Sequence, residues 1–185
     1  AQEKLSFKWC DTPNDFLDIW NTLYQNLVQR HQLKGGLHDY TFAQFQDLFN
    51  LPQARLFIAL KGNEVILMHL WLINSDNTRA YSHLIAPTPQ AYTHFASYGL
   101  YDFALAFFQN KNFRYALLGS GLKDNDGLSH FKSGWANLVL PNALFCSVLH
   151  QEAYKSLSFQ SDTKFFPAYR SSDVRLKHST FRRSR

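Results

Sequence analysis

The segment RAYSHLIA, residues 79–86, carries two side chains that could take part in proton transfer. Tyr81 and His83 are two residues apart, so they share one face if this segment is a strand. An imidazole titrates near neutral pH and could take the proton that an attacking amine loses, directly or through water. A hydrogen-bonded structural histidine is the alternative. His69 lies in the preceding apolar segment and could pair across with the same face, in a register that sequence alone does not define.

A second set of polar side chains lies between Ser120 and Trp135. Lys132 would place a cation at a strand–loop junction, where it could stabilise a phosphate or a developing oxyanion. A solvated surface lysine is the alternative. Asp126 and His130 flank this lysine and could shape the same pocket, together with Ser120. Asp126 is equally an ordinary loop residue, because aspartate bonds readily to its local backbone.

Several classes of chemistry are disfavoured by what the chain lacks. Cys10 and Cys146 lie far apart and form neither a C-x-x-C pair nor a cluster with histidines, so we expect neither a zinc site nor a disulfide framework. Walker loops, dinucleotide fingerprints and Ser-His-Asp orders are also missing. We therefore predict no metal cofactor, and neither triad hydrolysis nor nucleotide-driven chemistry.

The 185 residues are 45% apolar and 16% aromatic, which suffices for one packed core. We expect one domain over residues 1–169 and a basic tail over residues 170–185, which holds much of the formal net charge of +5. Such a tail could contact the phosphates of a tRNA, or it could be a solvated terminus. No run approaches the roughly 18 apolar residues that span a bilayer, and no signal-like start is present. We expect a cytoplasmic protein without a membrane span.

The N-terminal part of the chain predicts a strand and two helices. Residues 5–9 alternate between apolar and polar types, as in a half-buried strand. Thr12 precedes a proline and would supply a capping oxygen, and apolar positions over 16–28 then recur at helical spacing. Thr41 and Gln44 have the spacing of a capping box, which predicts a second, shorter helix.

Strands and helices then alternate along the rest of the chain. Residues 54–61, 64–73 and 79–86 are apolar runs separated by turn signals, which predicts an antiparallel meander of three strands. The remaining patterns predict a helix over about 97–110, a buried strand over 113–119, an apolar strand over about 138–149 and a helix over about 151–159.

The stretch YALLGSGLKDNDGLSHFKSGW, residues 115–135, joins an apolar strand ending in L-G-S to D-G-L and F-K-x-G-W. It resembles the matching stretch of the Fem-type peptidoglycan-bridge aminoacyltransferases and of related GNAT-like acyltransferases. W-x-x-L-Y from Trp20 and Y-x-H-x-x-A from Tyr81 are similar to that family too. The resemblance implies an α/β (α+β) fold, with a single GNAT-like domain. Its mixed central sheet would have an antiparallel N-terminal meander and be flanked by helices.

The resemblance also implies an activity, the transfer of an acyl or aminoacyl group from acyl-CoA or aminoacyl-tRNA to an amine acceptor by direct attack. Lys132 matches a lysine of the family's active region, and Tyr81 and His83 would lie where the central strands part to form the acyl pocket. The helix start near Ser97 would bind donor phosphates through backbone N–H groups, or Ser97 is a plain N-cap. The residues of this turn are Phe95, Ala96, Ser97, Tyr98 and Gly99.

Two features set the chain apart from this family. Residues 87–98 lack the glycine-rich acetyl-CoA signature, and Fem-type enzymes usually have two GNAT-like domains, whereas this chain has length for one. A second subunit, as in a homodimer, could complete the acceptor site. The alternative function is a non-catalytic GNAT-like binding domain that has lost donor binding.

Overall fold

The computed structural model describes residues 4–34, 38–121, 126–141, 143, 145–158 and 166–170. The chain divides into two compact units. The first holds Ala1–Leu27 and Thr41–Val139, and the second holds Val28–Tyr40 and Leu140–Arg185. Apart from Arg170, the basic tail expected from the sequence lies outside the described residues. One domain over residues 1–169 stays a prediction.

A five-stranded mixed sheet forms the centre of the first unit. Its strands lie in chain order; the first four pair antiparallel, and the last is parallel to its neighbour. The strands are β1 (Leu5–Cys10), β2 (Ala54–Lys61), β3 (Glu64–Ile73), β4 (Arg79–Pro87) and β5 (Tyr115–Leu117). The predicted meander is therefore confirmed, and β2 and β3 have the predicted bounds.

The described part of the chain also holds six α-helices and two short 3-10 helices. None of these helices combines the length and the apolar character that crossing a membrane requires. They are η1 (Pro13–Phe16), α1 (Leu17–Arg30), α2 (Phe42–Phe49), α3 (Pro89–Thr93), α4 (Ala96–Asn110), α5 (Gly127–Ser133), α6 (Gln151–Leu157) and η2 (Ala168–Arg170).

The two helix starts predicted near the N-terminus differ in outcome. At α2, the Gln44 N–H donates to Thr41 Oγ1 over 3.3 Å and the Thr41 N–H donates to Gln44 Oε1 over 2.8 Å, so the capping box is confirmed. Thr12 is the N-cap of η1, as predicted, but its side chain makes no capping hydrogen bond, so the predicted capping oxygen is wrong. Its hydroxyl donates instead to Asp15 Oδ2 over 2.8 Å, because the carboxylate of the first turn lies within reach.

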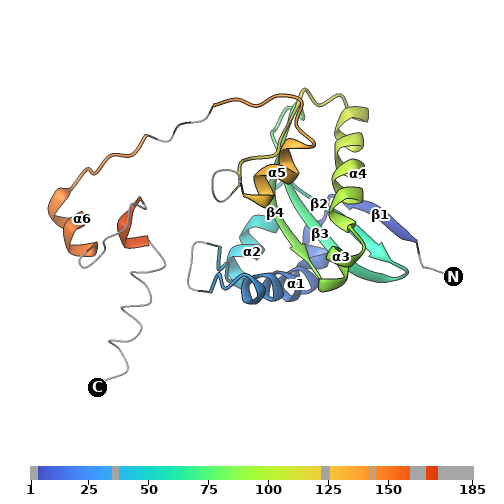
Figure 1. Cartoon of the computed structure of the whole chain (residues 1–185), viewed down its shortest axis with the longest axis horizontal. Helices are drawn as coiled ribbons and strands as arrows, with labels where there is room; N and C mark the ends of the chain where they lie inside the picture. The colour runs from blue at the N-terminus through green and yellow to red at the C-terminus, as the bar shows by residue number, and fades with distance from the viewer. Residues whose placement is uncertain are drawn as a thin grey trace, which may run out of the picture. The chain divides into compact units, whose positions relative to one another are not determined.

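Helices cover both faces of the sheet (Figure 1). α4 lies against β1, β2 and β3 and covers the face that carries Phe57 and Leu67. Side chains alternate along a strand, so Leu56 and Met68 point to the opposite face, where α1 and α2 lie in Figure 1. All four side chains are fully buried. Because both faces of β2 and β3 are buried, the sequences of these strands are nearly continuous apolar runs.

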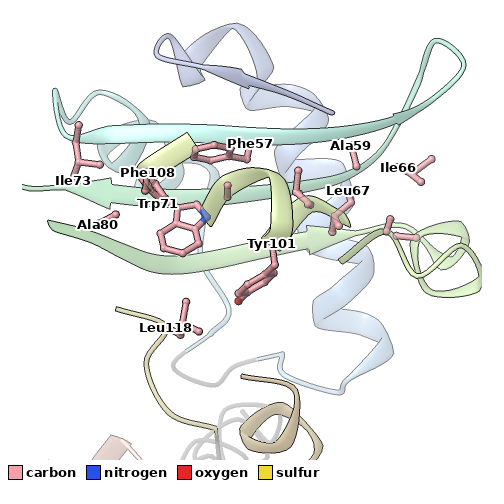
Figure 2. Packing of buried hydrophobic residues seen from close by; sticks show 14 residues of the cluster. Phe57, Ala59, Ile66, Leu67, Trp71, Ile73, Ala80, Tyr101, Phe108 and Leu118 are labelled. Carbon is pink, nitrogen blue, oxygen red and sulfur yellow. The ribbon is translucent and has the colours of Figure 1, made fainter. Parts of the chain in front are cut away.

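The core between the sheet and α4 is rich in aromatic rings (Figure 2). The ring centroids of Trp71 and Phe108 are 4.9 Å apart, and those of Phe57 and Phe108 are 5.4 Å apart. Each such pair contributes about 0.5–1.5 kcal/mol beyond the burial of its area. Tyr101 of α4 joins this core, with its ring 6.2 Å from that of Trp71. It brings a hydroxyl group into this layer.

The apolar segment 138–149 does not form the predicted strand in its described residues. Phe145 and Leu149 are 94% and 97% exposed, so these side chains have no apolar cover. A strand is stable only when a neighbour pairs with its backbone, and no described strand pairs with this segment. Pro141 also lacks the N–H that a central strand position needs. The helix predicted after this segment is confirmed as α6.

Candidate active site

β4 and β5 pair only over their first residues and then part. The parallel ladder runs from the pair Arg79–Tyr115 to the pair Tyr81–Leu117, where β5 ends, whereas β4 continues to Pro87. In the described chain, no later residue of β4 pairs on this side. The ladder between β4 and β5 therefore ends next to Tyr81. The remaining edge of β4 can pair with the amide groups of an extended ligand.

A bulge interrupts β4 at the same place. Trp71 of β3 pairs with Ser82 and Leu70 pairs with Leu84, so His83 has no partner in the ladder. Bulges turn side chains away from the regular pleat, and they are frequent beside active sites. The rings of Tyr81 and His83 lie 5.9 Å apart. Burial lowers the pKa of His83, so its imidazole is neutral and able to accept a proton near pH 7.

Lys132 lies on helix α5 and not at a strand–loop junction, which corrects the prediction. Asp126 is the N-cap of this helix, and its Oδ1 accepts the Ser129 N–H over 2.7 Å. The Lys132 Nζ donates to the carbonyl oxygen of Ser120 over 2.7 Å. Burial lowers the pKa of this half-buried ammonium, and the negative charge of Asp126 opposes that shift. Lys132, Ser120 and Asp126, all predicted from sequence, thus come together.

Gly119 joins this lysine to the parting strands. It has a φ of +72°, and a Cβ at this position would lie 3.6 Å from Lys132 Nζ and 3.9 Å from the hydroxyl oxygen of Tyr81. Both functional groups therefore flank the same short piece of backbone after β5. Sequence reasoning did not single out Gly119, although a glycine at the end of an apolar run is a signal for a positive φ.

His69 lies beneath this site, 1% exposed. Its Nε2 is 2.9 Å from Ser82 Oγ, which is 3.2 Å from the hydroxyl oxygen of Tyr101. Burial, with a smaller contribution from the nearby positive charge of Lys132, lowers the pKa of His69 from 6.5 to about 3. The imidazole is therefore neutral at physiological pH and does not reach the surface. The sequence analysis did not identify Ser82 and Tyr101, because their contact depends on strand register and helix packing.

The first turn of α4 holds the five residues predicted to bind the donor. Phe95 is the N-cap, with φ +52° and a 70% exposed side chain, so the alternative that Ser97 is the N-cap is wrong. Ala96 is buried, and the Tyr98 ring packs 5.0 Å from Phe131 of α5. A Cβ on Gly99 would meet the ring of Phe7 at 2.4 Å, so packing against β1 already requires this glycine.

His130 is exposed on α5. Within the part of the chain that the structure describes, its imidazole has no recorded contact with Lys132, Tyr81 or His83. In the same residues, no three histidine, cysteine or acidic side chains gather as a metal site would require. The described groups suited to chemistry are thus the imidazole of His83, the phenol of Tyr81 and the ammonium of Lys132.

The chain was compared with known proteins. No protein-family model matches it, and no curated protein is detectably similar. Solved structures do match. An aminoglycoside acetyltransferase from an uncultured soil metagenomic sample, in complex with sisomicin, has a TM-score of 0.59 at 17% identity, covering 79% of this chain and 97% of that one.

Two further structures agree. A ribosomal-protein-alanine N-acetyltransferase from Brucella melitensis biovar Abortus 2308 has a TM-score of 0.58 at 9% identity, covering 78% of this chain and 100% of that one. An aminoglycoside N-acetyltransferase in complex with CoA has a TM-score of 0.54 at 15% identity, covering 80% and 96%. At such identities the likeness establishes the fold and not the substrate. The chain has the α+β fold of the GNAT acetyltransferases, with a mixed five-stranded sheet flanked by helices.

Proposed function

We propose that the protein is an N-acyltransferase that moves an acyl group from acyl-CoA to an amine acceptor by direct attack. The observation that carries this proposal is that the Lys132 ammonium and the Tyr81 hydroxyl both flank Gly119, just after the ladder between β4 and β5 ends. Further support comes from three solved structures with this fold that are acetyltransferases, one of which was solved with CoA.

The described residues fit a donor of this kind. The free edge of β4 after Tyr81 suits an extended chain of amides, and the α4 N-terminus beyond it offers backbone N–H groups to phosphates. The turn from Phe95 to Gly99 would hold the phosphate end of the donor. The lack of a side chain at Gly99 is explained separately, by its packing against Phe7. When bound, acyl-CoA supplies a thioester that an amine can attack.

Each protein group then has a role in the transfer. His83 accepts the proton that the amine loses, since its lowered pKa keeps the imidazole neutral. Lys132 places a positive charge where the carbonyl oxygen becomes negative, and half-burial strengthens that charge interaction. Tyr81 is positioned to orient the acceptor beside His83. Ser120, Asp126 and His69 hold the lysine and the strands in place, and exposed His130 would contact the acceptor.

A finer version of the proposal concerns the donor and partners. The Fem-type resemblance of residues 115–135 suggests aminoacyl-tRNA as an alternative donor, bound in the cytoplasm through the basic segment 170–185. Binding of tRNA to the full chain, measured by filter retention, should then weaken steeply as the salt concentration rises, and removing residues 170–185 should abolish it. Equal binding by the full and shortened chains would exclude this contact. A homodimer that completes the acceptor site remains part of the same proposal.

A non-catalytic binding domain is the second candidate. One observation favours it: Gly99, a glycine close to the missing donor signature, is explained by its contact with Phe7. This candidate predicts that neither acetyl-CoA nor longer acyl-CoAs shift the thermal unfolding temperature.

The test of the proposed function measures release of the CoA thiol from acetyl-CoA in the presence of aminoglycosides and peptide amines. Lys132→Met should lower the rate about a hundredfold, as expected for loss of one oxyanion-stabilising group. Lys111→Met, at the exposed end of α4, is the matched control and should keep the wild-type rate. If the wild-type protein neither binds nor consumes any acyl-CoA, the CoA-dependent function is excluded.

A further inference from the structure

Three buried polar side chains form a hydrogen-bonded series through the core of the first unit. His69 comes from β3, Ser82 from β4 and Tyr101 from α4, and successive atoms lie 2.9 Å and 3.2 Å apart. The His69 ring packs against both Trp71 and Tyr101, with each ring centroid 4.8 Å away. All three polar side chains are at most 7% exposed. Burying such groups in an aromatic core is costly unless they are hydrogen-bonded, as these three are.

One end of the chain of bonds is attached to the bulge. Ser82 is the last β4 residue paired before the ladder skips His83, and its side chain points into the core toward His69. Its neighbours Tyr81 and His83 therefore have their side chains directed elsewhere, and their rings lie 5.9 Å apart at the parting of β4 and β5. Any slip of the bulge by one residue would exchange the buried serine for one of these rings.

The other end is attached to helix α5. The Tyr101 ring lies 5.0 Å from Phe131 and 6.1 Å from Trp135, on either side of Lys132 in the sequence. Tyr101 therefore touches the helix that carries the lysine and the serine that fixes the bulge. The hydroxyl oxygens of Ser82 and Tyr101 connect the two sides of the candidate site.

The number of hydrogen-bond donors in this series of side chains indicates which nitrogen of His69 carries the proton. A neutral imidazole, a serine and a tyrosine supply three donors, and only two bonds join them. His69 Nδ1 is buried without a described partner. A buried N–H without an acceptor is rarer than an unbonded acceptor, so the proton belongs on Nε2, which donates to Ser82.

We propose that Ser82 and Tyr101 are positioning residues: with His69 as the bonding partner, they hold the β4 bulge and helix α5 in the arrangement that brings Tyr81, His83 and Lys132 together. The catalytic consequence rests on the proposed function. The positioning role does not depend on the proposed function, since it concerns the conformation of β4 and α5 in the protein without ligands.

The experiment compares Ser82→Ala and Tyr101→Phe, each of which removes one oxygen atom, with Ser133→Ala and Tyr115→Phe. Ser133 bonds only locally, to the His130 carbonyl, and Tyr115 is exposed on β5. Hydrogen–deuterium exchange should rise over residues 79–87 and 127–133 in the first pair and remain unchanged in the second. Nitrogen-15 spectra should show His69 with its proton on Nε2 in the wild type, and a shifted Nε2 resonance in Ser82→Ala.

Turnover is the second measurement. If the wild type transfers acyl groups, Ser82→Ala and Tyr101→Phe should lower kcat by roughly tenfold to a hundredfold through misplacement, with KM changed by less than about threefold. Unchanged exchange over both segments in both variants would overturn the positioning role, whatever the activity. An inactive wild type with increased exchange in the variants would overturn the proposed function alone. Tyr101→Phe keeps the aromatic ring, so this variant alone tests the positioning role if Ser82→Ala does not fold.

Discussion

The ammonium nitrogen of Lys132 lies 2.7 Å from the carbonyl oxygen of Ser120. This bond attaches helix α5 to the chain that leaves β5. Gly119, which precedes Ser120, has a left-handed φ of +72°, and a Cβ there would lie in van der Waals contact with the lysine and with Tyr81. The backbone of Gly119 and the position of the lysine are therefore coupled.

Gly119→Ala should lower both stability and activity. Placing a side chain at φ +72° costs about 1–2 kcal/mol, and its Cβ would lie 3.6 Å from Lys132 Nζ. We expect the free energy of unfolding, measured by urea titration, to fall by about that amount. The rate of acyl transfer should fall further than the loss of folded protein explains.

Gly127→Ala is the matched control for this substitution. Gly127 is the first residue of α5, and nothing lies within 4 Å of the Cβ it would gain. Alanine is the better helix former, so this variant should be as stable as the wild type or more stable. If Gly119→Ala is equally harmless, the strained turn does not hold the lysine.

Much of the fold could be predicted from sequence because its signals are local. β2 and β3 follow apolar runs ended by turn residues, and α2 follows the Thr41 capping box. α3 was overlooked although Thr88 Oγ1 accepts the Ala91 N–H and Pro89 stands at the first position, which is a helix start. Segment 138–149 has an equally apolar pattern, but a strand also needs a neighbouring backbone, which local pattern does not report.

The candidate site was predictable in its residue types and not in its connections. Lys132, Tyr81 and His83 stand out by their chemistry. The bond from Lys132 to Ser120, the bulge at His83 and the contact of Ser82 with Tyr101 depend on tertiary packing. Sequence spacing specifies faces of single elements, whereas these contacts arise between elements whose register and crossing are set by the whole core.

Gly99→Ala tests whether packing explains this glycine. The added Cβ would lie 2.4 Å from Phe7 Cζ, so the ring of Phe7 must move, and we expect a loss of about 1–3 kcal/mol in the free energy of unfolding. In a Phe7→Leu background the ring is absent, and the same substitution should be neutral or slightly stabilising, since alanine favours a helix. A double-mutant cycle by urea denaturation gives the interaction energy directly.

The same variants separate packing from donor binding. If Gly99 serves only packing, Gly99→Ala in the Phe7→Leu background should bind acetyl-CoA as tightly as Phe7→Leu alone, measured by calorimetric titration. Weaker binding despite restored stability would show that the helix start itself needs the glycine. A loss of stability that persists without the Phe7 ring would contradict the packing explanation.

His69 makes stability depend on pH in a defined window. Its pKa is lowered from 6.5 to about 3 in the folded protein, so below pH 6.5 the unfolded chain binds a proton that the folded chain does not. The free energy of unfolding should therefore fall as the pH is lowered from 6.5 toward 3, by up to about 1.4 kcal/mol per pH unit from this group. Urea titrations at each pH measure it.

His69→Gln isolates this contribution from that of the carboxylates. The glutamine amide can still donate to Ser82 but does not titrate, so the variant should lose less stability between pH 6.5 and 3 than the wild type does. His130→Gln, which replaces an exposed histidine of α5, should keep the wild-type profile. Parallel profiles for the wild type and His69→Gln would mean that the buried imidazole is protonated in the folded protein, and the chain of bonds to Ser82 and Tyr101 would then need a charged partner.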